Sequence, residues 1–326
     1  MGKPNAASIP HSAHRRALVL LPFSLALPLG ASASADRPGE WPTRPVQITV
    51  VYPPGGISDQ IARALAELMK RQLGMAVVVD NRAGASGTIA LELLSKRNPD
   101  GHSLCFAAAT AAALLARAAS KRSTPSRTPV PVAGVMRTPI LVVGTRSLRA
   151  GSFGQMIDAA RERPGSIRWA TTGEGTTGHA VLSRVSQMSG AEIVHIPYKG
   201  GGQQIADALA GHFEVLSTNV AAAQLEDIAS GRLVALAVGA PERLDVLPHV
   251  PTLAELGYPD ANLDSLFGLF APAGVSSELV QKMHRAVATA LAHPSLRDKL
   301  LQMNNIPFDG SAADFARLVA REALFR

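Results

Sequence analysis

The sequence predicts an α/β protein of two lobes, each a mostly parallel sheet flanked by helices, with a hinge between the lobes. Short β-branched stretches alternate with stretches of helical apolar spacing, an order typical of parallel strands covered on both faces. The chain has 326 residues, which is more than one hydrophobic core usually serves. A strand, a glycine-rich loop and a helix follow one another at Gly55, Gly173 and Gly200. Together these features favour a binding cleft between two lobes.

The first 35 residues are expected to form a signal peptide. A basic stretch ending at Arg16 precedes an apolar run over residues 17–30 and a small-residue cleavage site at Ala33-Ser34-Ala35. The run has 14 residues, fewer than the about 20 that a bilayer span requires. The pair Arg15-Arg16 leaves the Sec and the Tat export routes open. We therefore expect a protein of the periplasm.

Composition excludes several other classes of protein. Cleavage would remove three basic residues and lower the formal charge from +7 to +4, which is not a nucleic-acid signature. Aromatic residues make up 4% of the chain and are not interleaved with a basic run, so nucleic acid is not an expected partner. The only cysteine, Cys105, lies in an apolar stretch and is expected to be buried. The nine histidines show no zinc spacing, so neither a metal nor a cofactor is expected.

The first lobe is predicted to comprise residues 36–139 and 240–326, and its first part is a βαβαβ unit. Apolar spacing predicts strands at 46–52, 76–80 and 103–108 and helices at 61–73 and 88–96. Asn98-Pro99-Asp100-Gly101 predicts a turn. The Ala-rich run 107–119 favours a helix, whereas the basic, Pro-rich stretch 121–129 favours an exposed connector.

The second lobe is predicted to comprise residues 140–239. Its expected strands are 140–143, 167–171, 193–196, 213–218 and 233–238, and its expected helices are 152–163, 177–188, 203–209 and 225–230. Beyond residue 240 the chain is expected to return to the first lobe. There Thr252 and Glu255 form a capping box that opens a short helix, followed by a strand at 266–270, a helix at 277–291 and a last helix from Ser311. Two crossings between the lobes predict the hinge.

The loop Pro53-Pro54-Gly55-Gly56 is predicted to point backbone N–H groups at an anion. Glycine reaches backbone angles closed to other residues, and the helix that follows begins with unpaired N–H groups and a partial positive charge. A carboxylate or a phosphate can bind such an end without Lys or Arg. Asp59, at the start of the helix, is expected to favour the helix dipole or to pair locally.

The loop Gly173-Glu174-Gly175-Thr176-Thr177-Gly178 matches the glycine pattern of dinucleotide-binding loops. The ribose-binding acid expected after the next strand is missing, because that strand ends at Pro197-Tyr198-Lys199. Thr176 and Thr177 fit better as hydroxyls that hold a carboxylate at a helix N-terminus. For His179, helix capping or packing is favoured over catalysis. Tyr198, Lys199 and Gly200 are predicted to contact a ligand, because the cation would complement an acid.

The sequence lacks the common catalytic motifs. The chain has no Gly-x-x-x-x-Gly-Lys phosphate loop, no Gly-x-Ser-x-Gly elbow and no His-Glu-x-x-His pair. The sequence therefore predicts a binding protein that is not an enzyme. An enzyme that uses a nucleotide cofactor at Gly173–Gly178 remains the weaker alternative.

Seven motifs between residues 54 and 274 carry a family resemblance. They are Pro54-Gly55-Gly56-Ile57-Ser58-Asp59, residues 81–87 (NRAGASG), Pro99-Asp100-Gly101, residues 173–179 (GEGTTGH), residues 197–201 (PYKGG), residues 247–257 (LPHVPTLAELG) and Ala271-Pro272-Ala273-Gly274. Over about residues 41–315 the chain resembles the substrate-binding proteins of tripartite tricarboxylate transporters, also called the Bordetella uptake gene family of periplasmic solute receptors.

The resemblance implies a type II-like periplasmic binding protein whose lobes close on a small organic acid. It further implies delivery to membrane permease subunits, and we expect a monomer. A receptor that serves a signalling sensor protein uses the same cleft and stays an alternative. The resemblance assigns ligand contacts to Tyr52, Gly55, Gly56, Ile57, Asp59, Ser86 and Gly87 in the first lobe and to Thr176, Thr177, His179, Tyr198 and Gly200 in the second. The loop after the third predicted strand adds Ala109 and Thr110 as candidates. The Ala run 107–119 departs from the Asn-Pro and Tyr-Asp pattern usual in the family.

Overall fold

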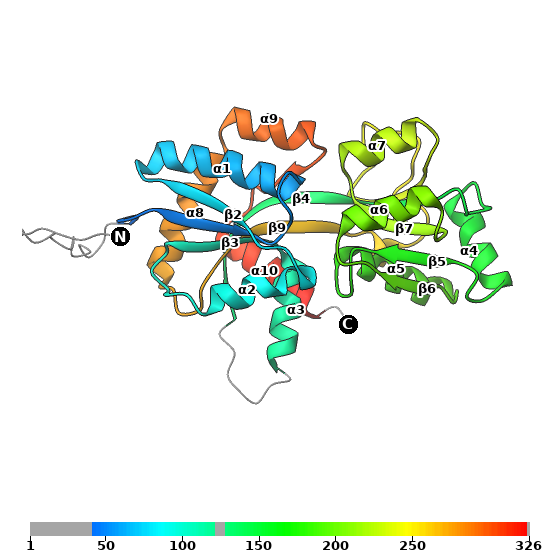
Figure 1. The fold of residues 1–326 in the computed structure, drawn as a ribbon, viewed down its shortest axis with the longest axis horizontal. Coiled ribbons are helices and arrows are strands. Elements are labelled where there is room, and N and C mark those ends of the chain that lie inside the picture. The colour runs from blue at the N-terminus through cyan, green and yellow to red at the C-terminus, as the bar shows by residue number, and fades with distance from the viewer. Residues whose placement is uncertain (1–40, 121–127, 325–326) are drawn as a thin grey trace, which may run out of the picture. The chain divides into compact units, whose positions relative to one another are not determined.

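A computed structural model describes residues 41–120 and 128–324, which lie in one compact unit. The predicted signal peptide, residues 1–35, lies outside the described residues, as does most of the basic connector. The backbone forms one mixed sheet of ten strands in the order β2-β1-β3-β9-β4-β7-β5-β6, and β8 and β10 also pair with β4 (Figure 1). The strands are β1 (Val46–Val50), β2 (Val77–Asn81), β3 (Ser103–Ala108), β4 (Val130–Gly144), β5 (Arg168–Thr171), β6 (Val194–Pro197), β7 (Val215–Asn219), β8 (Val234–Gly239), β9 (Asp264–Ala271) and β10 (Ile306–Pro307).

Each lobe contains three parallel strands. In the first lobe β1 pairs in parallel with β2 and β3, and in the second β5 pairs in parallel with β6 and β7. Between these sets β4 and β9 are antiparallel to their neighbours. The two-lobed α/β class is confirmed, and its parallel pairing is confined to the outer part of each lobe.

Strand β4 belongs to both lobes. Residues 130–139 pair with β9, and residues 140–144 pair with β7 and β8. The sequence predicted only the second part, as a strand at 140–143. The first part contains Pro131 and Pro139, and its register with β9 shifts twice, so its pattern lacks the even alternation of a simple strand. A single continuous strand therefore connects the lobes.

Helices cover both faces of each lobe, as expected for alternating strands and helices. In the first lobe α1, α8 and α9 pack around Leu65 and Val287 on one face, and α2, α3 and α10 pack around Leu91 and Phe315 on the other. In the second lobe α4 and α5 pack around Trp169, and α6 and α7 lie on the opposite face. The α-helices are α1 (Ile57–Leu73), α2 (Thr88–Ser95), α3 (Ala109–Ser120), α4 (Phe153–Glu162), α5 (Thr177–Ser189), α6 (Gly201–Ala210), α7 (Ala222–Ala229), α8 (Ser277–Leu291), α9 (Pro294–Gln302) and α10 (Ala312–Leu324).

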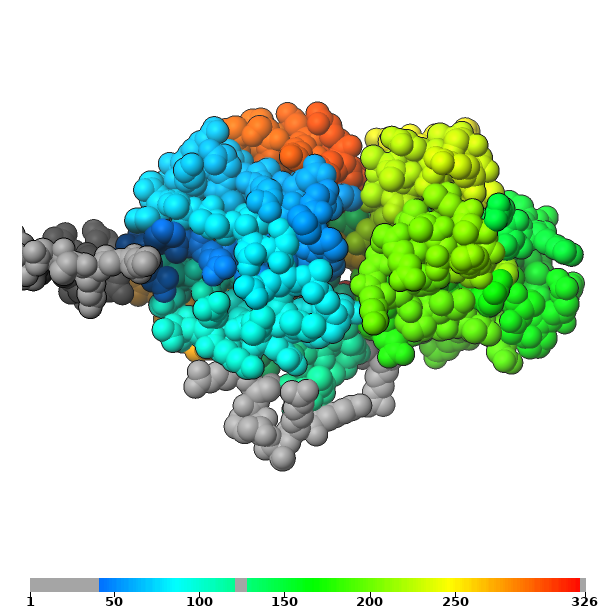
Figure 2. Space-filling model, viewed as in Figure 1, coloured from blue at the N-terminus to red at the C-terminus, as the bar shows by residue number. Residues whose placement is uncertain are grey.

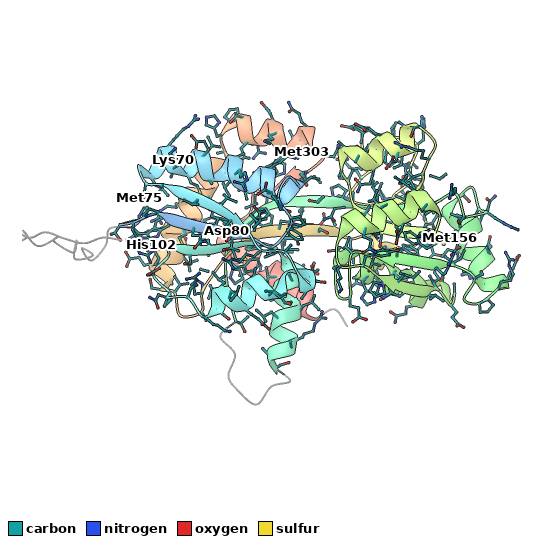
Figure 3. The ribbon with its side chains drawn as sticks, viewed as in Figure 1. Lys70, Met75, Asp80, His102, Met156 and Met303 are labelled. Atoms are coloured by element: carbon teal, nitrogen blue, oxygen red, sulfur yellow. The ribbon has the colours of Figure 1, made fainter. Side chains whose placement is uncertain are left out.

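The side chains of the core follow this plan. Figure 3 shows Met156 within the second lobe and Lys70 on α1 of the first lobe. The Met156 side chain is buried, whereas Lys70 is exposed. Cys105 is fully buried in the first lobe as predicted, and burial raises the pKa of its thiol. Among the helices of the described residues, none is long and apolar enough to cross a bilayer.

The chain returns to the first lobe later than predicted. Residues 240–263 pack on the second lobe, where Leu253 and Ala261 join the core around Trp169 and Tyr258 stacks edge-on against Phe153 at 5.3 Å. The return occurs at Asp264, where β9 begins. This corrects the predicted boundary at residue 240.

The capping box in this segment forms without a helix. Thr252 N–H donates to Glu255 Oε2 at 2.7 Å, and Glu255 N–H donates to Thr252 Oγ1 at 3.1 Å. The segment then turns at Gly257, whose φ is +88°, and Pro259 follows closely. The reciprocal bonds therefore close a turn in place of the predicted short helix.

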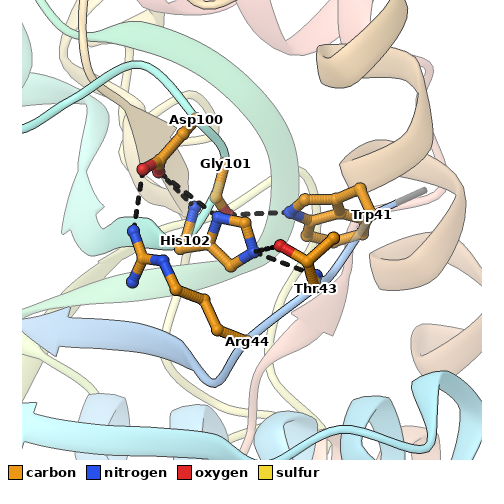
Figure 4. A network of polar contacts seen from close by, with 6 residues as sticks. All are labelled: Trp41, Thr43, Arg44, Asp100, Gly101 and His102. Carbon is orange, nitrogen blue, oxygen red and sulfur yellow. Dashed lines mark hydrogen bonds and ion pairs between the residues drawn. The ribbon is translucent and has the colours of Figure 1, made fainter. Parts of the chain in front are cut away.

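The start of the described chain is tied to the predicted turn at 98–101 (Figure 4). Trp41 Nε1 donates to the Gly101 carbonyl at 3.1 Å, and Arg44 pairs with Asp100 at 2.7 Å. Thr43 N–H donates to His102 Nε2 at 3.2 Å. Gly101 has a φ of +79°, and a Cβ there would lie 2.6 Å from Trp41 Nε1. Only glycine fits this contact without rearrangement.

Gly268 provides a test of the packing between β4 and β9. A Cβ at Gly268 would overlap the Ala133 carbonyl of β4 and the ring of Phe315. We expect Gly268→Ala to lower the free energy of unfolding by about 1–3 kcal/mol. The matched control is Gly154→Ala in α4, where a Cβ meets open space and should stabilise by about 0.5–1 kcal/mol. Urea denaturation measures both variants, and equal effects would contradict the packing described.

Candidate ligand-binding site

A cavity of about 240 Å³ lies where the two lobes meet. In Figure 2 their surfaces meet along a narrow furrow between the blue start of α1 and the green region of α6. The residues lining the cavity come from both lobes, including β4 and β9, the two strands on which the chain crosses between the lobes and which are called the shared strands below. They are Val51, Tyr52, Pro53, Ala83, Gly84, Ser86, Gly87, Ala108, Thr110, Ile140, Thr172, Thr176, Thr177, Gly178, Lys199, Gly200, Gly201, Ser217, Thr218, Asn219, Ser265 and Phe267.

Four helices begin at this cavity. The lining includes Gly87 at the N-cap of α2, Thr110 in the first turn of α3, Thr177 at the start of α5 and Gly200 at the N-cap of α6. No side chain caps α2 or α6 within the described structure. Helix N-termini carry unpaired N–H groups and a partial positive charge. Their convergence makes the cavity favourable for an anion.

Hydroxyl groups of both lobes also remain available to a ligand. Other lining hydroxyls are engaged: Ser217 Oγ donates to the Gly178 carbonyl at 2.9 Å, and Ser265 Oγ donates to Asn219 Oδ1 at 2.7 Å. Four hydroxyls form no hydrogen bond within the described residues, namely those of Ser86, Thr110, Thr172 and Thr177. Thr177 is buried, and a buried polar group usually has a partner. Ser86, Thr110 and Thr172 are partly exposed, so their hydroxyls are accessible to a polar ligand.

The charge of the lining favours an anion as well. Lys199 is the one charged residue in the lining, and no Asp or Glu side chain of the described chain contributes to it. Lys199 is exposed and forms no ion pair within the described residues. Val51, Ala108 and Phe267 provide an apolar wall. The cavity therefore combines neutral donors, one cation and apolar surface.

The glycines of the first glycine loop do not line the cavity, although Pro53 of the same loop does. Gly55, Gly56, Ile57 and Asp59 lie outside the lining, and the Gly55 N–H donates to Asp59 Oδ2 at 2.9 Å. Burial by itself raises the pKa of Asp59, but hydrogen bonds from Arg63 and Gly55 outweigh it and lower that pKa. The chain's own carboxylate thus accepts the Gly55 N–H that was predicted to face a ligand.

Thr176 and His179 shape the second glycine loop. Thr176 Oγ1 accepts from the His179 N–H at 3.4 Å and donates to the Gly173 carbonyl at 2.8 Å, so it caps α5. His179 Nδ1 accepts from the Gly175 N–H at 3.0 Å, and its ring stacks on His195 with centroids 4.3 Å apart. His179 lies outside the cavity lining, in the capping and packing role that the sequence favoured.

Tyr198 and Ala109 face away from the cavity, although their neighbours line it. The Tyr198 hydroxyl donates to Asp207 Oδ2 at 2.7 Å, and its ring packs against Phe213. Burial and this bond raise the pKa of Tyr198 to about 12. Ala109 is fully buried in the first lobe. Lys199 and Thr110 are the adjacent residues that reach the cavity.

The structure thus brings together half of the predicted set. The predicted residues that line the cavity are Tyr52, Ser86, Gly87, Thr110, Thr176, Thr177 and Gly200. Sequence analysis missed the residues of the shared strands and of β7, such as Ile140, Asn219 and Ser265. The polar run Ser217-Thr218-Asn219 at the end of a buried strand was the available signal.

Comparisons with known proteins agree on one family. The sequence profile described as "Tripartite tricarboxylate transporter family receptor" matches residues 61–324. The chain is similar to Protein BugT of Bordetella pertussis, with 35% identity over 266 residues that cover 81% of this chain and 80% of BugT.

Several solved structures share the fold. A Rhodopseudomonas palustris protein, Rpa4515 with adipate, has 31% identity and a TM-score of 0.75, covering 87% of this chain and 95% of that one. MatC of the same organism, with bound malate, has 25% identity and a TM-score of 0.74, covering 87% and 98%. The periplasmic binding protein BugD has 26% identity and a TM-score of 0.72, covering 87% and 97%.

Thr176 and Thr177 have different roles that mutation can separate. Thr176→Val removes the hydroxyl that caps α5, and we expect the free energy of unfolding to fall by about 0.5–2 kcal/mol. The neighbouring control Thr177→Val removes a hydroxyl without a partner in the described chain and should change stability by less than about 0.5 kcal/mol. Chemical denaturation at neutral pH compares the two. A larger loss for Thr177→Val would show that its hydroxyl is structural.

Proposed function

The chain belongs to the tripartite tricarboxylate transporter receptor family, and on that premise we propose that it binds a small organic acid in its interlobe cavity for delivery to a membrane permease. The family consists of periplasmic solute receptors and not of enzymes. The weaker alternative of a nucleotide-cofactor enzyme is therefore dropped. The one observation that carries the proposal is the convergence of four helix N-termini on a cavity whose described lining holds no carboxylate.

The energies indicate which groups must do the binding. A helix N-terminus contributes about 0.3–2 kcal/mol to holding an anion. Micromolar affinity requires about 8 kcal/mol after the cost of immobilising the ligand is met. Hydrogen bonds to a charged group contribute about 1.5–3 kcal/mol each, so the unpartnered hydroxyls of Ser86, Thr110, Thr172 and Thr177 add a comparable amount. Both kinds of donor are needed, and both lobes supply them.

The cavity also bounds the size of the acid. Its 240 Å³ corresponds to about eight water volumes of roughly 30 Å³ each. This space suits an acid with on the order of ten non-hydrogen atoms, such as the adipate and malate bound by the two R. palustris proteins. The apolar wall of Val51, Ala108 and Phe267 would cover the carbon chain, while the donors hold the carboxylate.

Two lobes joined by shared strands suit a receptor that closes on its ligand. With the acid bound to donors of both lobes, closure gains contacts that neither lobe provides alone. We propose that the protein works in the periplasm as a monomer and presents its closed form to permease subunits. This step rests on the family, whose members serve as receptors of that transporter.

Ligand screening tests the proposal directly. We expect a fitting mono-, di- or tricarboxylate to raise the thermal unfolding midpoint, with about 2.7 kcal/mol of stabilisation at a hundredfold excess over Kd. Neutral amides of the same shape are the matched controls and should have no effect, because they lack the charge that helix ends attract. Calorimetry then gives Kd, and Thr177→Val should raise it severalfold. If no acid shifts the midpoint, or amides act equally, the proposal fails.

Lys199 is expected to distinguish acids by their number of carboxylates. The hydroxyls and helix ends can hold one carboxylate, and the exposed ammonium of Lys199 is the remaining cation for a second. Lys199→Gln should weaken a dicarboxylate by up to about fivefold, the effect of an exposed ion pair, and leave a monocarboxylate unchanged. Lys70→Gln on α1, away from the lining, is the control. Calorimetry at low and high salt checks this, since salt should narrow the difference.

A further inference from the structure

The loop Gly173–Thr176 of the second lobe lies against the first lobe. Thr172 and Thr176 line the cavity on one side of this loop. A Cβ at Gly173 would lie 2.7 Å from Ser86 Oγ of the first lobe, and a Cβ at Gly175 would overlap the Leu114 side chain of α3. Gly173 and Gly175 thus pack closely against side chains of the first lobe. The shape of this loop therefore affects both the ligand site and the contact between the lobes.

Groups of the second lobe hold the loop from behind. His179 Nδ1 accepts the Gly175 N–H at 3.0 Å. Thr171 Oγ1 accepts the Gly173 N–H and donates to the Gly173 carbonyl, both at 3.2 Å. The ring of His195 stacks on His179 at an interplanar angle of 16°, and its Nε2 lies 2.8 Å from Thr171 Oγ1. Two stacked imidazoles and one threonine thus fix both glycines.

The direction of the hydrogen bond sets the required protonation state. The backbone N–H of Gly175 can only donate, so His179 Nδ1 must be free of a proton to accept it. His195 is not constrained in this way, because a proton on Nε2 would donate to Thr171 Oγ1, whose own proton goes to the Gly173 carbonyl. A proton added to His179 therefore breaks the bond to Gly175, whereas a proton added to His195 breaks none.

We propose that His179 is a positioning residue that holds the Gly173–Thr176 loop in its ligand-binding shape only while Nδ1 is unprotonated, so that ligand affinity falls in acid. The inference rests on the proposed function and adds a residue and a condition to it. His179 acts through Gly175 and Thr176 and is not itself part of the cavity lining.

The charges around the pair agree with this role. Burial lowers the pKa of His179 and of His195, and the charge of His179 lowers that of His195 further. Glu174, in the same loop, is the acidic group facing both rings and raises both values, without reversing the direction. An ordinary histidine titrates near about 6.5. Both rings are therefore neutral at neutral pH, and the loop is intact there. The hydrogen bond from Gly175 to His179 is lost as the pH falls below the pKa of His179.

The test compares the pH dependence of affinity in wild type and His179→Asn. Asparagine places its Oδ1 near the position of Nδ1, so it can accept the Gly175 N–H but cannot titrate. We expect similar Kd values for the two proteins at pH 7.5, measured by calorimetry with the best acid of the screen. Below the pKa of His179, the wild-type affinity should fall by up to about tenfold per pH unit relative to His179→Asn. Taking the ratio cancels the titration of the ligand itself.

A second variant and a spectroscopic measurement complete the design. His195→Gln keeps a polar group for Thr171 but removes the second imidazole, and its affinity should still fall in acid. By NMR, the amide signal of Gly175 in the wild type should shift with the same midpoint as the His179 ring. Equal pH profiles for wild type and His179→Asn, or a Gly175 amide indifferent to the ring, would overturn the inference. If no acid binds at pH 7.5, the proposed function itself fails, which is a separate outcome.

Discussion

An α-helix begins with amide N–H groups that have no partner in its own backbone, and four helices of this protein bring that deficit to one cavity. A buried donor without a partner costs free energy, so such a site favours whatever supplies acceptors. The two oxygens of a carboxylate supply several. The absence of Asp and Glu from the described lining agrees with this need for an external acceptor, because a carboxylate of the protein would compete with an anionic ligand. Among the described residues, Lys199 is the only charge that the cavity contains.

At helix α1, a side chain of the protein itself accepts a hydrogen bond from the unpaired backbone N–H groups. Its Gly-Gly turn was predicted to point backbone N–H groups at an anion, yet Asp59 accepts the Gly55 N–H. Burial of a lone carboxylate would be costly, but Arg63 pairs with it at 3.0 Å and makes the arrangement stable. Sequence alone could not decide whether a ligand or Asp59 accepts the Gly55 N–H. An acidic residue four positions after the glycine is compatible with either partner. Helix α6 has no such acid in its first turn, and its glycine cap lines the cavity.

Local signals predicted most of the fold, and non-local contacts account for the errors. The helix at 277–291 has its predicted bounds because its apolar period and its cap are written in consecutive residues. The lobe boundary after residue 240 was misplaced because it depends on Leu253 reaching the core around Trp169. Similarly, Ile140, Asn219 and Ser265 meet at the cavity only through the pairing of β4 with β7 and β9. The predicted residues that line the cavity come from loops that are continuous in sequence, whereas lining residues gathered from separate strands were not predicted.

The Ala-rich helix α3 departs from the family pattern, yet its N-terminus still reaches the cavity. Ala109, Ala111 and Ala112 are all buried, in the core cluster that also contains Leu91 of α2 and Phe315 of α10. A side chain that ends at Cβ lets neighbouring backbones approach closely, and a Cβ at Gly87 would lie only 3.1 Å from that of Ala111. This close packing brings Thr110 to the cavity and Leu114 to Gly175 of the other lobe. Alanine is also the strongest helix former, so the segment stabilises the helix whose N-terminus reaches the cavity.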